Sequence, residues 1–269
     1  MSESSGGARS ARAPRLNAIC PYFTMFPYSF PERVLAHLDP PPGLVLDPFC
    51  GRGTTNLAAR ARGYATVGMD ANPLAVALTA AKLVETTPER IKNQLRELER
   101  NPVDVEVPSS EFWRWAFAPN TLLRLTNLRA KLSAPTENPE RIALRALIAG
   151  ALHGPINMGS PSYLSNQAPR TFAPKPRYAL KFWRSRNLRP REVDIAEIVE
   201  RRANWYYNAA LPAVRSSTIL GDARSLSAEW LQGRVDTVVT SPPYWQMRTY
   251  KPDQWLRLWF LGGPEDVEY

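Results

Sequence analysis

The chain has 269 residues, of which 44% are hydrophobic, and its 34 Lys and Arg against 25 Asp and Glu give a formal net charge of +9. This length suits one large domain or a core with an insertion, and the charge favours a polyanionic partner such as nucleic acid. Two Cys and two His exclude a disulfide framework and a His/Cys metal cluster, and no apolar run reaches the ~20 residues of a membrane span. We expect an intracellular protein without metal.

Residues 1–15 are small, polar and basic, and they predict a flexible tail. The next segment places aromatic residues between prolines, and it includes Phe26 and Pro27. A helix is predicted from Pro31 to Leu38, with the proline in its first turn. The aromatic residues could wall a pocket or pack in the core, and the pattern alone does not separate the two.

A short apolar run from Leu44 to Leu46 predicts a buried parallel strand, which ends in Asp47. A turn with Gly51 and Gly53 follows, and a helix is predicted from Thr54. Glycines without a Cβ let a ligand approach the backbone closely, although Gly-x-Gly also occurs in any tight turn between strand and helix.

A second strand, from Tyr64 to Met69, ends in Asp70 about 20 residues later, where an acid commonly holds ribose hydroxyls. Helices are predicted over 72–85 and 88–100. The alternation of strands and helices indicates a doubly wound sheet that binds a nucleoside.

Residues 101–215 depart from this alternation, because helices are predicted over 111–132, 140–152 and 193–207 without buried strands between them. Residues 153–170 read as a loop, and the stretch 170–191 is basic with interleaved aromatic residues and no acid. Such a composition suits single-stranded or opened DNA, or else a solvated face with aromatic residues packed beneath it. The candidate nucleic-acid residues are Arg170, Lys175, Arg177, Lys181, Arg184, Arg186, Arg189 and, further along, Trp245.

The sheet is predicted to resume with strands at 218–220, followed by Asp222, and at 235–240. The second runs directly into Ser241-Pro-Pro-Tyr244, and a helix is predicted over 254–261. Prolines lack an N–H, so their carbonyls stay free to accept, and the Ser241 hydroxyl with the Pro242 carbonyl could grip an amino group. Tyr244 offers a face for a flipped base. The turns near residues 50 and 242 are expected to open side by side at one rim of the sheet.

Asp-Pro-Phe-Cys-Gly-Arg-Gly-Thr-Thr together with Ser-Pro-Pro-Tyr resembles the S-adenosylmethionine-dependent DNA amino-methyltransferases. Ser241 at the start of the second motif is similar to the N4-cytosine branch of this family, since adenine-N6 enzymes more often carry Asp or Asn at that position. The resemblance implies cofactor-binding roles for Phe26, Pro27, Asp47, Pro48, Phe49, Gly51, Gly53, Thr54, Thr55, Asp70 and Asp222, and catalytic roles for Ser241, Pro242, Pro243 and Tyr244. It implies direct methyl transfer to N4 of cytosine in DNA, without a covalent intermediate. The motif order differs from the commonest one for Ser-Pro-Pro-Tyr enzymes.

The expected fold is a Rossmann-like α/β methyltransferase sheet that is incomplete at the C-terminus, with a mainly helical insertion. The core would comprise 16–100 and 216–269, and the insertion 101–215 would recognise the target. Four strands can be placed where this fold normally has seven, so the chain is expected to be either one half of a split enzyme or a truncated product. In the first case a second polypeptide or self-association would complete the sheet. The alternatives are a half-enzyme that binds cofactor and DNA without catalysis, and an RNA or protein amino-methyltransferase.

Overall fold

The computed structural model describes residues 13, 15–22, 26–39, 41, 43–157, 159–227, 235–243 and 250–267. Its residues group into two compact units, Met1–Thr87 with Trp205–Met247, and Pro88–Asn204 with Arg248–Tyr269. The predicted boundaries lay at 100/101 and 215/216, so two helices expected in the core lie in the second unit.

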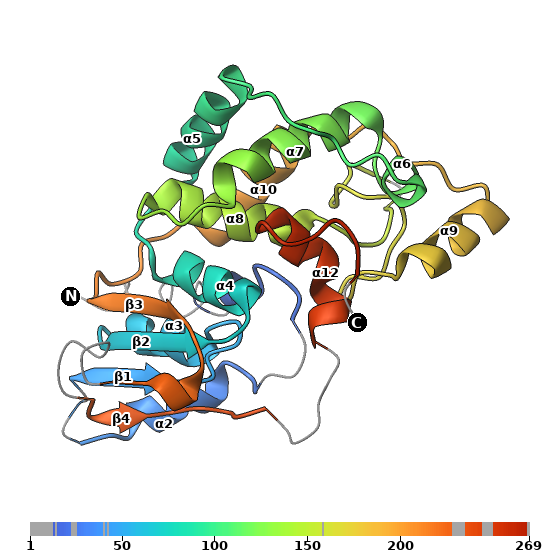
Figure 1. The fold of residues 1–269 in the computed structure, drawn as a ribbon. Helices are drawn as coiled ribbons and strands as arrows, with labels where there is room; N and C mark the ends of the chain where they lie inside the picture. Colours follow the sequence, from blue (N-terminus) through green and yellow to red (C-terminus); the bar gives the residue numbers. More distant parts are fainter. Residues whose placement is uncertain are drawn as a thin grey trace. The chain divides into compact units, whose positions relative to one another are not determined.

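The first unit is an α/β layer structure around a parallel sheet (Figure 1). Its elements are α2 (Ser29–Ala36), β1 (Leu44–Asp47), α3 (Thr54–Ala61), β2 (Ala65–Asp70), α4 (Pro73–Leu83), β3 (Ser216–Leu220), the short 3-10 helix η1 (Ala223–Ser225) and β4 (Thr237–Val238). The strand order among the described residues is β3-β2-β1-β4, and all three pairings are parallel. The four strands are those that the sequence predicts, and the Rossmann-like fold class is confirmed.

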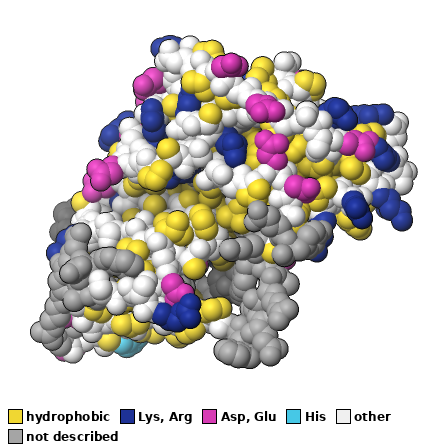
Figure 2. Space-filling view, in the orientation of Figure 1, with side chains coloured by type: hydrophobic (Ala, Val, Ile, Leu, Met, Phe, Trp, Pro, Cys, Tyr) yellow, Lys and Arg dark blue, Asp and Glu magenta, His cyan; other side chains and the backbone are white. Residues whose placement is uncertain are grey.

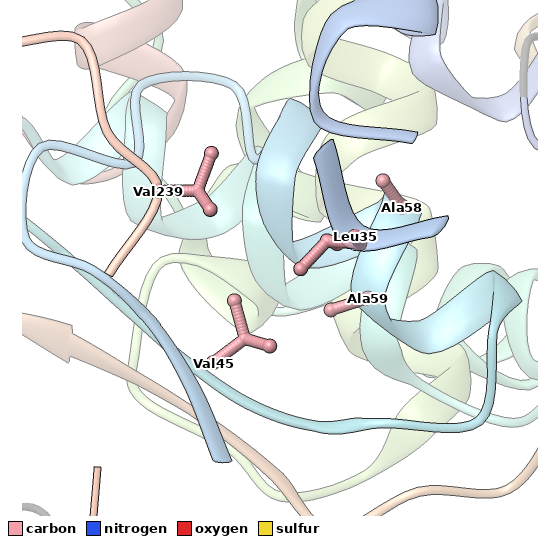
Figure 3. Close-up of a cluster of buried hydrophobic side chains, with 5 residues drawn as sticks. All are labelled: Leu35, Val45, Ala58, Ala59 and Val239. Carbon is pink, nitrogen blue, oxygen red and sulfur yellow. The ribbon is translucent and has the colours of Figure 1, made fainter. Parts of the chain in front are cut away.

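The two faces of β1 bury different side chains, because successive residues of a strand point to opposite faces. Val45 packs with Leu35 of α2, Ala58 and Ala59 of α3, and Val239 beyond β4, as Figure 3 shows. On the opposite face Leu44 and Leu46 pack with Val67 of β2. Helices α2 and α3 therefore cover the first of these faces and hold β1, and with it the start of the turn that follows, in place.

The second unit is helical in its described part and contains α5 (Pro88–Arg100), α6 (Glu111–Ala116), α7 (Pro119–Leu132), α8 (Pro139–Ala151), α9 (Pro176–Ser185), most of α10 (Ile195–Tyr206) and α12 (Tyr250–Phe260). Two of these helices had been expected in the methyltransferase core, namely α5 and α12. The buried side chains of α5 face α7 and α8. The buried Trp259 of α12 lies 4.4 Å from Trp113 between ring centroids. Aromatic packing thus draws the C-terminal helix into this unit.

One predicted helix, 111–132, is wrong in its middle. The structure breaks it into α6 and α7, because Pro119 occupies the first turn of α7 and Ala118 before it is extended at ψ 151°. A residue before proline avoids the helical region. Helix α9 was not predicted at all within the basic stretch, although Pro176 at its start and the four-residue spacing of the buried Ala179 and Trp183 are helical signals.

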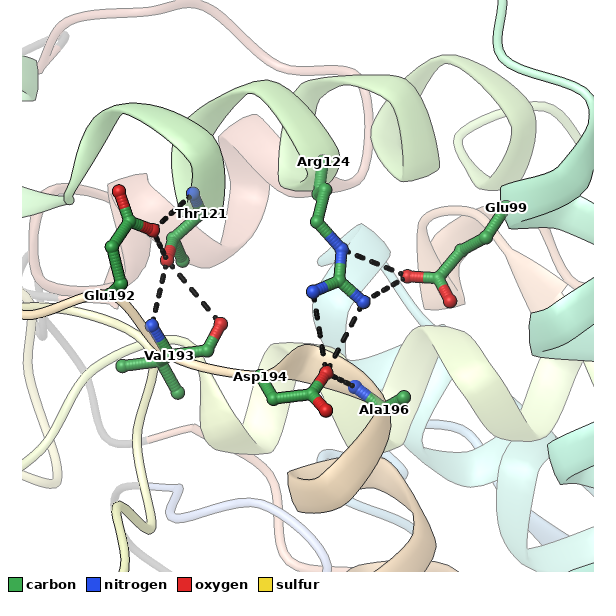
Figure 4. A network of polar contacts seen from close by, with 7 residues as sticks. All are labelled: Glu99, Thr121, Arg124, Glu192, Val193, Asp194 and Ala196. Atoms are coloured by element: carbon green, nitrogen blue, oxygen red, sulfur yellow. Dashed lines mark hydrogen bonds and ion pairs between the residues drawn. The ribbon is translucent and has the colours of Figure 1, made fainter.

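Two carboxylates fasten the segment that leads into α10, as Figure 4 shows. Glu192 accepts hydrogen bonds at 3.1 Å from the N–H groups of Asn120 and Thr121, at the positive end of α7. Asp194 and Glu99 both pair with Arg124, at 3.3 and 2.6 Å. The segment from α9 to α10 is therefore tied to α7.

We expect Glu192→Ala to lower the free energy of unfolding by about 1 kcal/mol, because two N–H groups of α7 lose their acceptor. Urea denaturation measures this. Glu197→Ala is the matched control, since Glu197 makes an exposed pair with Arg201 four residues on, for which ~0.3–0.5 kcal/mol is usual. Equal losses in the two variants would contradict the capping role.

Candidate functional site

The turns after β1 and β4 lie next to one another at one edge of the sheet. Leu46 is in register with Val238 in the parallel pair, so Asp47 and Thr240 both follow at the carboxyl ends. The Thr240 hydroxyl donates to Asp47 Oδ1 at 2.7 Å. The Asp-Pro-Phe turn and the Ser241-Pro-Pro segment therefore start from two hydrogen-bonded residues, as the sequence predicts.

The Gly-x-Gly turn is closed by backbone hydrogen bonds and by contact with α4. Gly53 donates to the Cys50 carbonyl at 2.7 Å and adopts a φ of 76°, which disfavours other residues. A Cβ on Gly53 would lie 2.6 Å from Thr79 Oγ1 and 2.9 Å from Thr79 Cα. Only glycine fits, because the backbone of α4 cannot move away as a side chain could.

Asp70 holds this turn from the end of the neighbouring strand β2. Its Oδ2 accepts from Gly51 N–H at 2.9 Å, and its Oδ1 accepts from Asn72 N–H at 2.8 Å. Burial raises the pKa of Asp70, and these backbone hydrogen bonds oppose the shift. The Ala71 N–H also interacts with this carboxylate, whose two oxygens together can accept a further donor such as a hydroxyl.

Helix α3 begins directly after the turn, and no described side chain caps its first turn. Thr54 and Thr55 are buried. Contact with a ligand at this helix start would therefore involve backbone N–H groups, which favour anions.

The other predicted cofactor residues lie in different surroundings. Pro48 is half-buried and Phe49 is 37% exposed, so both border the turn. Phe26 is half-buried, with its ring centroid 5.2 Å from that of Phe30, and Pro27 is exposed. The neighbours 23–25 lie outside the described residues.

Asp222 follows β3 and is already paired. Its two oxygens accept from Arg224 Nε and a terminal nitrogen at 2.6–3.1 Å, and this side-chain contact lowers the pKa of Asp222 to about 2. An adenine amino group at Asp222 would have to replace Arg224.

Ser241, Pro242 and Pro243 are exposed beyond β4. The predicted residues Tyr244 and Trp245 lie outside the described residues.

A buried lysine that was not predicted from the sequence stabilises the turn by a hydrogen bond to its backbone. Lys82 of α4 is fully buried, and its ammonium group donates to Asn17 Oδ1 at 2.9 Å and to the Arg52 carbonyl between the two glycines. Asn17 in turn accepts from the Thr54 hydroxyl at 3.3 Å. Burial, together with the charge of Arg52, holds the pKa of Lys82 well below its usual range. The apolar context of Lys82 in the Ala-Leu-rich helix was the available signal.

The cysteine within the turn has no reactive character. Burial raises the pKa of the Cys50 thiol, and Thr79 donates to its sulfur at 3.4 Å. Cys50 is thus a packed thiol in the turn. Among the described residues, no three His, Cys, Asp or Glu side chains are grouped to hold a metal ion, and no helix there has the length and apolarity to cross a membrane.

The predicted nucleic-acid residues cluster on α9 and its flanks in the second unit, where Figure 2 shows Lys and Arg side chains gathered at one end. Several of them already have partners: for example, Arg184 pairs with Glu111, Arg186 lies 4.2 Å from the Phe182 centroid, and Arg189 lies 3.9 Å from the Trp115 centroid. All of the set up to residue 189 are exposed, namely Arg170, Lys175, Arg177, Lys181, Arg184, Arg186 and Arg189.

Residues 4–81 match the family described as DNA methylase of the N6/N4 type. The predicted resemblance to the DNA amino-methyltransferases is confirmed. A 45-residue segment is also 47% identical to "Type II methyltransferase M.ScaI" of Streptomyces caespitosus, and it covers 17% of this chain and 15% of that methyltransferase. The methylase match contains the Gly-x-Gly turn and Asp70, whereas Asp222 and the Ser-Pro-Pro segment lie outside it.

Asp47 should make stability fall as pH rises. Burial raises its pKa to about 6 from 3.8, so the folded state binds more protons than the unfolded state between these values. Ionisation across that window costs about 3 kcal/mol of stability. Asp47→Asn cannot ionise and keeps an oxygen for Thr240. We therefore expect the unfolding free energy of Asp47→Asn minus that of wild type, measured in urea, to increase by that amount as the pH rises from 4 to 7.

Asp222→Asn is the control, because the pKa of Asp222 is lowered to about 2. Its difference from wild type should be flat over that range. If the difference in unfolding free energy between Asp47→Asn and wild type were also independent of pH, it would contradict the raised pKa that we attribute to the burial of Asp47.

Lys82→Met should loosen the Gly-x-Gly turn, because the Arg52 carbonyl and Asn17 lose their donor. We expect amide hydrogen exchange at Gly51 and Gly53 to accelerate about tenfold, the equivalent of one lost buried hydrogen bond. Lys92→Met is the control, since Lys92 pairs with Glu89 and Glu200 on the surface. Unchanged exchange in Lys82→Met would remove its role in holding the turn.

Proposed function

We propose that this protein transfers a methyl group from S-adenosylmethionine to an exocyclic amino nitrogen of a base in DNA, and that the acceptor is N4 of cytosine. The observation that supports this most directly is the 2.7 Å hydrogen bond from Thr240 to Asp47. It joins the turn of the methylase match to the segment that carries Ser241 and Pro242, so that donor and acceptor would meet at one edge of the sheet.

The residues present fit the cofactor. Gly51 places backbone against the Asp70 carboxylate, which retains capacity for the ribose hydroxyls, and the uncapped start of α3 suits the methionine carboxylate. Phe49 and Phe26 would contact the apolar parts, and Asp222 would reach the adenine amino group after exchanging Arg224. The bound cofactor supplies an electrophilic sulfonium methyl group.

The second turn would hold the acceptor. The target base leaves the duplex at a cost of about a few kcal/mol, and Tyr244 stacks on it. The Ser241 hydroxyl and the Pro242 carbonyl orient the amino group, and Pro243 keeps the backbone fixed without an N–H that would compete. The amino nitrogen attacks the methyl carbon in line as the carbon–sulfur bond breaks, and the nitrogen then loses a proton. Cys50 takes no part.

DNA phosphates would be contacted by the basic residues on α9 and its flanks, namely Arg170, Lys175, Arg177, Lys181, Arg184, Arg186 and Arg189. Trp245 would line the opening that receives the base. We further propose an intracellular role in a restriction-modification pair, as the word "type II" suggests for the relative. A second polypeptide or a second copy would cover the outer edge of β4, where Val238 is 54% exposed.

The test is mass spectrometry of nucleosides from DNA incubated with the full chain and methyl-deuterated S-adenosylmethionine. We expect labelled N4-methylcytosine, and Ser241→Ala should reduce it at least a hundredfold while leaving cofactor affinity, measured by calorimetry, unchanged. Ser110→Ala is the control, because the Ser110 side chain at the start of α6 makes no capping hydrogen bond.

The same measurement separates the alternatives. Labelled N6-methyladenine would overturn the cytosine assignment and keep amino-methylation. Cofactor binding without transfer, rescued by a second polypeptide, would indicate a half-enzyme. Label in RNA or protein, and none in DNA, would replace the DNA substrate. Full activity of Ser241→Ala would dismiss the role of the hydroxyl.

A further inference from the structure

The helical unit contains an open pocket of about 330 Å³ between α9 and the loop before it. This volume lies at the lower end of the ~300–1,000 Å³ range of small-ligand sites. Its lining is Pro155, Gln167, Ala168, Pro169, Arg170, Pro174, Tyr178, Ala179, Phe182 and Trp183. The walls are mostly apolar and aromatic, with Gln167 and Arg170 as the long polar side chains.

The pocket is held in shape by buried hydrogen bonds. Trp183 is 1% exposed, and its indole N–H donates to the Gln167 carbonyl at 2.6 Å. Asn166 next to it donates to the carbonyls of Trp115 and Leu188 at 3.0 and 3.1 Å. His153 Nδ1 lies 2.8 Å from the Pro169 carbonyl. A ligand would therefore meet a preformed wall.

The Gln167 side chain has one fixed orientation. Its Oε1 accepts from the N–H of Ile156 at 2.6 Å. Because an N–H needs an acceptor, the amide atom that faces Ile156 must be the oxygen, and the amide nitrogen faces away from Ile156. No hydrogen bond of that amide nitrogen occurs among the described residues. Gln167 lines the pocket, so its amide group is the candidate donor for a ligand acceptor.

Arg170 lines the pocket, and α9 carries aromatic and cationic side chains next in sequence to its lining residues. Tyr178 is 65% exposed and stacks on Phe182, with ring centroids 6.5 Å apart and planes at 18°. Arg177 and Lys181 are exposed one turn apart on the same helix, and the stretch 170–191 contains no acid. An apolar peptide would leave these cations unmatched, whereas the phosphates of a nucleic-acid strand would pair with them.

We propose that this pocket of the helical unit holds one unpaired nucleobase of the DNA. The base stacks on Tyr178 and Phe182, Gln167 donates to an acceptor on its edge, and Arg170, Arg177 and Lys181 contact the flanking phosphates. The inference rests on the proposed function in taking DNA as the ligand. It adds that a base-binding pocket lies within the helical unit itself.

The test uses the full chain and a single-stranded oligonucleotide with one central 2-aminopurine, followed by fluorescence quenching and anisotropy. An abasic oligonucleotide of equal length is the comparison. We expect quenching on binding, and about tenfold weaker affinity in Tyr178→Ala, because stacking on an aromatic ring strengthens binding by that order. Gln167→Glu keeps the acceptor for Ile156 but lacks the donor, and it should also weaken binding.

Two further variants separate stacking from charge. Arg177→Gln with Lys181→Gln should reduce the slope of log affinity against log salt by about 1.4, since a single strand contributes about 0.7 per phosphate contact, whereas Tyr178→Ala should leave the slope unchanged. Leu123→Ala is the control, because Leu123 is 46% exposed on α7 outside this pocket.

Wild type that binds the abasic strand as tightly as the 2-aminopurine strand would overturn the proposal. Unchanged affinity and unchanged quenching in Tyr178→Ala would also overturn it. The same holds if only an apolar peptide competes with the oligonucleotide for this site. Base binding in a protein that methylates no DNA would refute the proposed function alone. Methylation of cytosine with no effect of Tyr178→Ala would refute the pocket alone.

Discussion

The short hydrogen bond between Thr240 and Asp47 links two parts of the chain that are 193 residues apart. It forms because β1 and β4 are parallel neighbours, and parallel strands bring their carboxyl ends to the same edge. The hydroxyl also partly offsets the cost of burying the Asp47 carboxyl group, whose pKa nevertheless stays high. Everything assigned to the candidate site depends on this adjacency, since the proposed methyl transfer requires both turns at one edge of the sheet.

The turn after β1 is supported by groups of opposite character. Asp70 holds it through the Gly51 N–H, and Lys82 holds it through the Arg52 carbonyl. Both side chains are shielded from water to different degrees. Burial raises the pKa of Asp70 and lowers the pKa of Lys82, and so favours the neutral form of each. Unpaired polar groups in such a place are costly. The turn is therefore held in place by hydrogen bonds on both sides, while the start of α3 stays uncapped.

The sequence predicted β1 and β2 because a buried parallel strand is a short apolar run. Strands β3 and β4 are half-buried to exposed, and they were predicted from their apolar residues and the turns that follow them. It also predicted the adjacency of the two turns. Lys82 was missed because a lysine in a helix is usually solvated, although the apolar residues around it in that helix were a signal of its burial. Helix α9 was missed because exposed cations hid the spacing of Ala179 and Trp183. The division between units depended on Trp259, whose partner Trp113 is far away in sequence.

The brevity of β4 limits what can join the sheet at that side. Only Thr237 and Val238 form its ladder with β1, and Pro242 and Pro243 follow without backbone donors. A complementing strand would have to hydrogen-bond before the prolines and then diverge from them. Such an edge resists indiscriminate β-aggregation, and the double proline lies exposed beyond the ladder.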